Sequence, residues 1–258
     1  KSKKCVRSNL NRFGLHLSAL LQFEPGMFAG TSTAFNLAII SREPNESLFV
    51  AGIPNDIEGQ NALLDRFHKR KSGSSPSQGR MVKHSDFHGI SVLEAGERYV
   101  RLCKNKGLES HVFSTVVPRI ARVSDNEIEE NPDAVYVPEY GLGAATTKSE
   151  EAEGKGIELI ADPEIVVPEF LAQVLNSEAG HQFRKSAMIG SMRPALKSTI
   201  LAKRKLYLPT LKVQQEAVLT DRQIRRLRTE LGDLQSQLWD SPNEPIEVKE
   251  ELEMVNQE

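Results

Sequence analysis

The stretch "GHQFRKSAMIGSMRPALKSTILAKRKLYLPTLKVQQE", residues 180–216, carries eight Lys and Arg and no acidic residue until its last position. The whole chain of 258 residues has a formal net charge of only −2 at pH 7. The positive charge is therefore local, as in a basic surface on an otherwise acidic protein. Such a surface can neutralise phosphates, although a solvated helix face would give the same composition.

We identify the basic residues of this stretch as the candidate nucleic-acid contact. Each phosphate that they neutralise would release counterions. One of them, Arg193, lies in a turn rich in Gly, Ser and Pro, from which a guanidinium can reach the edge of a guanine. Gly190 and Ser191 would let this turn approach a nucleic-acid backbone closely. The basic cluster comprises Arg184, Lys185, Arg193, Lys197, Lys203, Arg204 and Lys205.

A long helix is predicted directly after the basic cluster, over residues 213–239. Its stripe alternates spacings of three and four, which is typical of a coiled-coil seam. The stripe comprises Ala217, Thr220, Ile224, Leu227, Leu231, Leu234 and Leu238. We expect the last five to form a seam with a partner, although so short a stripe could instead pack within the chain. Gly232 lies outside the stripe and weakens the helix.

The rest of the chain mixes helix and strand patterns, which predicts an α+β fold. Residues 9–22 have near-helical spacing, and the apolar run at 35–40 suits the middle of a sheet. From residue 90 to 168, short β-rich runs are broken by Pro and Gly. A helix is predicted over 168–178, with Pro near its start and Gly180 just past its end.

Composition limits the compartment and the class of protein. No apolar run is long enough to span a bilayer, and the pI near 6.4 argues against a protein that coats nucleic acid indiscriminately. Cys5 and Cys103 form no disulfide or metal framework, which favours a cytoplasmic protein. Because the chain begins with Lys1, we expect a fragment of a longer protein.

Two short motifs offer weak signals of cofactor or metal binding. "GLGAAT" at 141–146 nearly fits a dinucleotide-binding loop, but a Pro-containing strand precedes it and no helix is expected to follow. His84 and His88 are spaced for metal binding on a helix, yet no third ligand stands nearby and Gly89 favours a loop. We therefore expect no cofactor and no metal in the visible chain.

A third pattern has the residue order of a metal-dependent nuclease. Asp133 is followed twenty residues later by Glu153 and Lys155, an order in which two acids hold Mg²⁺ and a Lys positions water. In such nucleases the Glu and Lys lie on a buried strand, whereas here they fall in a highly polar loop. An ordinary exposed loop is the competing interpretation.

The segment "EFLAQVLNSEAGHQFRKSAMIGSMRPALKSTILAKRKLYLPTLKVQQEAV", residues 169–218, resembles part of a known domain. It is similar to the closing half of a target-recognition domain from type I restriction-modification specificity subunits. The likeness rests on Leu175-Asn176-Ser177, Gly190-Ser191, Leu196, "LYLPTLKVQQ" and the heptads, and extends over roughly residues 90–240. It implies a domain that reads half of a split DNA site and a coiled coil that spaces two readers.

The N-terminal segment "FEPGMFAGTSTAFNLAIISRE", residues 23–43, is similar to the late strands of N6-adenine DNA methyltransferases. The catalytic Asn/Asp-Pro-Pro-Tyr/Phe motif of that family is absent, because "NPDA" at 131–134 lacks the second Pro and the aromatic residue. The resemblance therefore implies a remnant of a methyltransferase-like domain, with S-adenosylmethionine used by a partner or by a missing domain.

These observations predict four segments. They are a methyltransferase-like α/β remnant at 1–89, a β-rich target-recognition domain at 90–212, a coiled-coil-type heptad helix at 213–240 and an acidic tail at 241–258. The expected function is sequence-specific recognition of double-stranded DNA in a restriction-modification or phage-defence assembly. The expected partners are methyltransferase or restriction subunits, or a second copy bound through the helix. Part of an active N6-adenine methyltransferase or restriction enzyme, and a subunit-docking module, are the alternatives.

Overall fold

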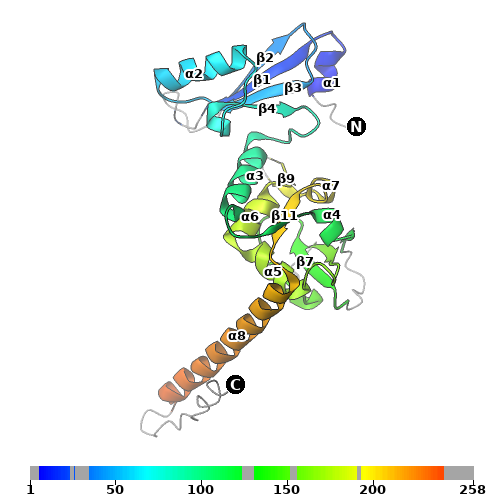
Figure 1. The fold of residues 1–258 in the computed structure, drawn as a ribbon, viewed down its shortest axis with the longest axis vertical. Helices are drawn as coiled ribbons and strands as arrows, with labels where there is room; N and C mark the ends of the chain where they lie inside the picture. The colour runs from blue at the N-terminus through cyan, green and yellow to red at the C-terminus, as the bar shows by residue number, and fades with distance from the viewer. Residues whose placement is uncertain are drawn as a thin grey trace. The chain divides into compact units, whose positions relative to one another are not determined.

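The computed structural model describes residues 6–23, 26, 35–123, 131–151, 156–190 and 193–240. The chain divides into two compact units, Lys1–Pro209 and Thr210–Glu258. The α+β class is confirmed in its coarse form, because helices and sheets together build the first unit (Figure 1). Of the helices in the described ranges, none has the length and apolar character needed to cross a membrane.

The first unit begins with a four-stranded sheet and a helix that covers one face of it (Figure 1). Its elements are α1 (Val6–Asn11), β1 (His16–Phe23), β2 (Phe35–Ser41), β3 (Ser47–Gly52), α2 (Ile57–His68), η1 (Pro76–Gln78) and β4 (Arg80–Lys83). The strand order is β2-β1-β3-β4, with β1 and β3 parallel and the other neighbours antiparallel. Asp56 caps α2 by accepting the Gly59 N–H at 2.6 Å.

The helix expected over residues 9–22 is only partly present, because His16–Phe23 form strand β1. This strand lies in the middle of the sheet and pairs with β2 on one side and β3 on the other. Ala19 and Leu21 on β1 are buried. Pairing on both edges and burial outweigh a weak helical period.

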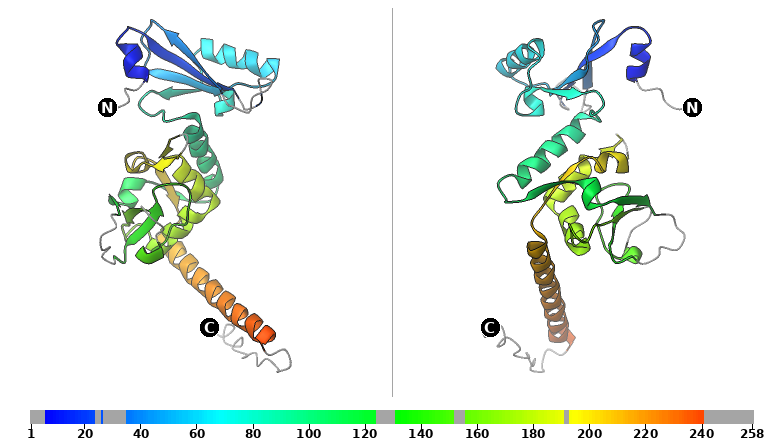
Figure 2. Two further views of the ribbon diagram at one scale, coloured as in Figure 1. Left: turned by 180° about the vertical axis from the view of Figure 1, so that it is seen from behind. Right: turned by 45° about the vertical axis from the view of Figure 1, so that its right-hand side comes forward.

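The remainder of the first unit combines short sheets with helices (Figure 2). Its elements are α3 (Ile90–Cys103), β5 (Glu109–Val112), α4 (Phe113–Val116), β6 (Arg119–Arg122), β7 (Ala134–Pro138), η2 (Ser149–Glu151), β8 (Gly156–Ile160), α5 (Pro168–Asn176), α6 (Glu178–Lys185), β9 (Met188–Ile189), β10 (Ala195–Leu196), α7 (Ser198–Leu201) and β11 (Lys205–Leu208). The strands pair antiparallel as β6-β8-β7, β9-β10 and β5-β11. The β5-β11 pair joins the beginning of this region to its end.

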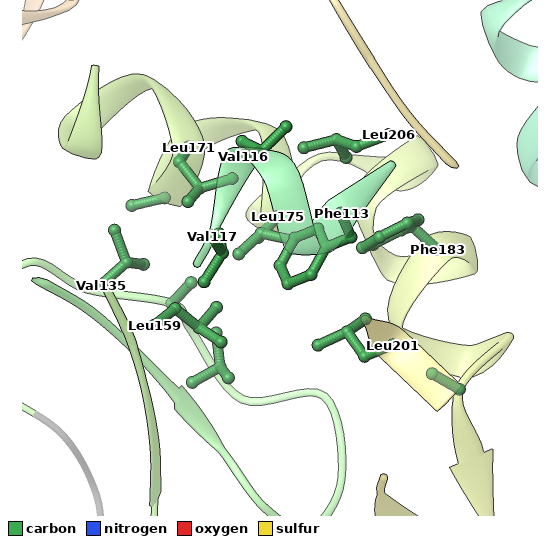
Figure 3. Close-up of a cluster of buried hydrophobic side chains, with 14 of the residues drawn as sticks. Phe113, Val116, Val117, Val135, Leu159, Leu171, Leu175, Phe183, Leu201 and Leu206 are labelled. Carbon is green, nitrogen blue, oxygen red and sulfur yellow. The ribbon is translucent and has the colours of Figure 1, made fainter. Parts of the chain in front are cut away.

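One apolar core holds these short sheets and helices together (Figure 3). Phe113 lies at its centre, with its ring centroid 5.3 Å from that of Phe183 on α6. Leu171 and Leu175 project into the core from α5, and Leu206 projects from β11. All five side chains are at most 1% exposed, so α5, α6 and β11 are fixed against one another by close packing.

The prediction of β structure was wrong for residues 90–103, which form helix α3. The buried side chains of this helix include Val92, Ala95, Tyr99 and Cys103, at spacings of three and four. That period marks one apolar helix face. It extends over residues 92–103, further than the short runs from which β structure was predicted.

The second unit contains the predicted long helix. This helix, α8, runs from Leu211 to Asp240, slightly longer than the expected 213–239. Ion pairs one turn apart support it, at 2.7 Å between Arg225 and Asp221 and at 2.7 Å between Arg226 and Glu230. The expected acidic tail at 241–258 lies outside the described residues.

Candidate nucleic-acid interface

Three consecutive cations lie at the turn from α7 into β11. Lys203 and Lys205 are exposed, whereas Arg204 is half-buried and donates a 2.6 Å hydrogen bond from Nη2 to the Ser186 carbonyl oxygen. Burial lowers the pKa of Arg204. The backbone of the turn is also fixed, because its carbonyl oxygens at Ala202 and Arg204 accept N–H groups from α4 at 3.0 and 2.7 Å. The cations are thus held on a rigid part of the fold.

Two clefts flank this turn, and Lys203 and Arg204 line both of them. The larger, of about 730 Å³, lies between α3 and β11. Its six cationic side chains are Arg80, Arg101, Lys104, Lys203, Arg204 and Lys205. The smaller, of about 420 Å³, adds Ser85, Asp86, His88, Thr199 and Ile200. The additional positive charge therefore lies on the side of the larger cleft, because the smaller cleft adds no Lys or Arg to those of the turn.

One acidic side chain lies in each cleft. Glu97 faces the larger cleft, where its Oε1 lies 3.0 Å from Nε of Arg80. Burial raises the pKa of Glu97. Asp86 faces the smaller cleft and accepts a 3.0 Å hydrogen bond from the Ser85 hydroxyl. Because six cations oppose a single carboxylate, the larger cleft remains strongly positive.

The two histidines considered as a metal pair have different surroundings. His84 Nε2 lies 2.8 Å from the side-chain amide of Asn45. His88 lines the smaller cleft, where burial and the positive charge of Arg204 lower its pKa. Across the described ranges, no three His, Cys, Asp or Glu side chains are grouped so that they could hold a metal ion.

A second cationic feature is formed by Arg193, which lies between β9 and β10, and by Tyr140 in the loop after β7. The guanidinium carbon of Arg193 lies 4.2 Å from the ring centroid of Tyr140, in a cation–π contact. Tyr140 is held by its bridge to Ala195, and the neighbouring Glu139 accepts a 2.6 Å hydrogen bond from Arg122. Arg193 and Tyr140 are both exposed, so this stacked pair is accessible from solvent.

Gly190 has an intramolecular reason for its place in this turn. Its φ of +123° is a conformation that other residues rarely adopt. A Cβ there would also lie 3.0 Å from the Arg193 carbonyl oxygen. The expected close approach of Gly190 to a nucleic-acid backbone stays a prediction. Ser191 lies outside the described residues.

The assignment of Arg184 to a DNA contact was wrong. Its side chain is 2% exposed and donates a 2.7 Å hydrogen bond from Nη1 to the Gly143 carbonyl oxygen. Burial lowers its pKa to about 10, and its Nε and Nη2 have no hydrogen-bond partner. The guanidinium is therefore inside the protein, where it fixes the loop at 139–146 and cannot reach a phosphate.

The remaining residues singled out in the sequence occupy varied positions. Lys185 is exposed at the end of α6, and Lys197 is half-buried before α7. The first helix after "GLGAAT" is the single turn η2, Ser149–Glu151. Asn176 instead binds this loop, accepting the Ala145 N–H at 2.7 Å and donating to the Ala145 carbonyl oxygen at 2.8 Å. Of the nuclease-like pattern, Glu153 and Lys155 lie outside the described residues.

Sequence reasoning missed Arg101 and Lys104, which extend the positive rim of the larger cleft. They follow each other by three residues at the end of α3, so they share a helix face. The signal was present, but the assignment of strands to this region hid it. Arg80 on β4 was missed because only folding brings it to the cleft.

Comparison of the sequence with protein-family models gave no match, and comparison with curated proteins gave none either.

Proposed function

We propose that this chain binds double-stranded DNA as the sequence-specific recognition module of a restriction-modification or phage-defence assembly. The observation that carries the proposal is the rigid turn of Lys203, Arg204 and Lys205 beside a cleft lined by six cationic side chains. Regularly spaced phosphates are the ligands that such an extended row of cations fits best. These cations replace Arg184 as the core of the phosphate-binding surface.

Base recognition is assigned to the loop that carries Arg193. A guanidinium stacked on an aromatic ring is pre-oriented, so little side-chain entropy is lost when it bonds to a base edge. Guanine, with two acceptors in the major groove, is the base that Arg contacts most often. Phosphate contacts would position the domain, and Arg193 would discriminate among sequences.

The resemblances supply the surrounding assembly. A methyltransferase partner or domain would use S-adenosylmethionine, and this chain would select the DNA site in the cytoplasm. The Leu175-Asn176-Ser177 motif has a clear role in the fold: Asn176 binds the Ala145 backbone, and the Ser177 hydroxyl accepts the Gly180 N–H at 3.0 Å to cap α6. The motif thus positions two segments that lead toward the Arg193 loop.

The first test is binding to a random pool of duplex DNA over a salt series, with sequencing of the retained fraction. We expect a short enriched motif and an affinity that falls steeply as salt rises. Lys203→Ala combined with Lys205→Ala should weaken binding to all sequences and reduce the salt slope by about 2. Arg193→Ala should reduce discrimination at one base by about 1–3 kcal/mol.

A matched control is Lys69→Ala, which removes an exposed cation directly after α2 that pairs with Asp65 at 2.7 Å. Its DNA affinity should equal that of the wild type. Binding without an enriched motif would reduce the proposal to non-specific attraction. No binding even at low salt would refute it.

A second candidate function, self-association, rests on the apolar stripe of α8. Ile224, Leu227, Leu231 and Leu238 are between 42% and 60% exposed, and Leu234 is half-buried. An apolar stripe along a 30-residue helix needs a partner surface. In a homodimer, the apolar stripe of α8 in one copy would pack against the same stripe in the second copy.

The charges favour antiparallel pairing of the two helices. In a parallel pair, Glu216 would face Asp221 of the other copy, and like charges would repel. In an antiparallel pair centred on the helix, Asp221 would face Arg228 of the other copy. Antiparallel pairing would also place small residues opposite large ones, with Ala217 opposite Leu234 and Thr220 opposite Leu231 of the other copy. Two Ala or two Thr side chains would then never face each other, so the dimer core would contain no cavity and no polar layer.

Sedimentation of charge variants tests this orientation. Asp221→Arg should weaken an antiparallel dimer because two Arg would then face each other, and adding Arg228→Asp should restore it. In a parallel dimer, Asp221→Arg would instead replace repulsion by attraction and tighten the complex. A chain that stays monomeric at high concentration would refute self-association.

A further inference from the structure

The larger cleft has an apolar floor beneath its positive rim. Leu93, Val100 and Tyr207 form the accessible part of this floor, and the buried rings of Tyr99 and Phe183 lie beneath it. The Tyr207 N–H donates to the Tyr99 hydroxyl at 2.9 Å, and their rings lie 5.7 Å apart, so the floor is rigid. A phosphate backbone alone would make no use of this surface, whereas a nucleobase stacks well on aromatic side chains.

The cleft also contains a carboxylate with spare acceptor capacity. Oε1 of Glu97 is buried and lies 3.0 Å from Nε of Arg80, an ion pair without hydrogen-bond geometry, and the Glu97 side chain is 19% exposed. A carboxylate has about four acceptor positions, so Glu97 can accept a further N–H group from a ligand in the cleft. A phosphate cannot be that ligand, because Glu97 would repel it. The exocyclic amino groups of adenine, cytosine and guanine can.

We propose that this cleft holds a single nucleotide, with its base on the apolar floor, its amino group donating to Glu97 and its phosphate at the rim of Lys203 and Arg204. A volume of about 730 Å³ is in the range of small-molecule sites. Thymine suits the cleft poorly, because its one ring N–H lies between two carbonyl oxygens that the carboxylate repels. The site therefore selects nucleotides that carry an amino group.

The nucleotide has two sources with the same chemistry. It is either free in solution or unstacked from a DNA strand bound by the basic surface. The second source rests on the DNA-binding function proposed above, whereas the first does not. Experiments with mononucleotides and with duplex DNA distinguish them.

Titration calorimetry of the full chain with dAMP, dCMP, dTMP and inorganic phosphate tests the site. We expect dAMP or dCMP to bind at least ~10-fold more tightly than dTMP and phosphate, a difference of one well-placed hydrogen bond. Glu97→Gln keeps the size of the side chain and should remove most of this preference. The matched control Glu164→Gln, at an exposed carboxylate outside the cleft, should preserve it.

Val100→Trp provides a second variant that does not depend on Glu97. Val100 is 49% exposed and lines the cleft, so a Trp can be accommodated and should fill the base site. Nucleotide affinity should fall ~10-fold or more, in line with loss of a stacking surface. Equal binding of all four ligands, or unchanged affinity in both Glu97→Gln and Val100→Trp, would overturn the inference.

Duplex DNA carrying 2-aminopurine, whose fluorescence rises when it unstacks, identifies the source. A rise that Val100→Trp abolishes supports a nucleotide unstacked from DNA. Mononucleotide binding without such a rise supports a free nucleotide. Duplex binding without either signal would overturn the nucleotide site and leave the proposed function intact, and loss of duplex binding as well would refute both.

Discussion

Arg184 carries a positive charge into the protein interior for one hydrogen bond to the Gly143 carbonyl oxygen. Arg184→Ala would leave a cavity and an unpaired carbonyl, so we expect the free energy of unfolding to fall by about 3 kcal/mol. Arg184→Met fills the space and removes a poorly solvated charge, so its loss should be within about 1.5 kcal/mol. Urea denaturation measures both changes.

The DNA affinity of Arg184→Met distinguishes a structural role from a binding role. Because the side chain is buried, the folded variant should bind DNA with wild-type affinity and an unchanged salt slope. A reduced slope would mean that Arg184 reaches a phosphate after all, through a conformation different from this one.

Protonation of His88, in the smaller cleft, should make the stability of the protein depend on pH. Burial, and then the positive charges of Arg204 and Lys203, lower its pKa below the usual value of 6.5, against the opposing charge of Asp86. The unfolded chain therefore binds more protons as pH falls through 6.5. The contribution of this group to stability should be complete above that pH and should be lost as pH falls from 6.5 through the lowered pKa. Because His88 is partly exposed, solvent screening keeps this loss small.

Urea denaturation of the wild type and His88→Asn between about pH 7.5 and about pH 5 measures this effect. The variant should lose stability less steeply on acidification. A residual slope is expected from His181, whose pKa is lowered by burial and by Arg184 and Lys185. Identical slopes in the two proteins would show that His88 is solvated.

At the scale of elements, two glycines within helices have opposite requirements. A Cβ at Gly180 in α6 would overlap the Val174 carbonyl oxygen and the Leu175 backbone, because α6 begins directly against the end of α5. A Cβ at Gly232 in α8 would meet nothing within 4 Å. Gly180→Ala should therefore destabilise the first unit by more than about 2 kcal/mol.

Gly232→Ala is the matched comparison. It should stabilise α8 by about 1 kcal/mol through helix propensity alone. Circular dichroism during thermal unfolding measures both variants. A tolerated Gly180→Ala would show that α5 and α6 can move apart, contrary to the close packing around Leu175.

The same glycine shows how far the sequence could predict the fold. Gly180 was expected to end a helix over 168–178, but that helix ends at Asn176 and Gly180 lies in the first turn of the next one. The glycine correctly indicated that the helix is interrupted near this position. It did not reveal the cause, which is the close contact between two helices. The stripe of α8 was readable because a heptad pattern needs no tertiary information.

Some residues of the candidate site could be predicted from the sequence, and others could not. Lys203, Arg204 and Lys205 are adjacent in sequence, so their shared position was predictable from the charge of the stretch. Arg184 has the same charge but turns inward, because α6 places it on the face that packs against Gly143. Glu97, Arg80 and the aromatic floor come together only through the tertiary fold, which no local pattern encodes.

At the scale of the whole molecule, the basic surface belongs to Lys1–Pro209 and the apolar stripe to Thr210–Glu258. If two copies join through α8, they present two DNA-binding surfaces on one assembly. Binding of the second surface to the same duplex then becomes intramolecular and gains effective concentration. A long duplex should therefore bind the dimer more tightly than a short duplex that accommodates one surface.

Leu231→Lys separates these contributions, because it places a charge in the centre of the stripe, at a residue that is 56% exposed in the single chain. The variant should sediment as a monomer and bind a duplex of about 15 base pairs like the wild type. On a duplex of about 60 base pairs it should lose at least ~10-fold in affinity, the part that effective concentration supplied. Fluorescence anisotropy at one fixed salt concentration measures the affinity for both duplexes.

An equal loss of affinity on the short and the long duplex would mean that Leu231 supports the DNA-binding unit directly. Pairing through α8 would then contribute nothing to the avidity.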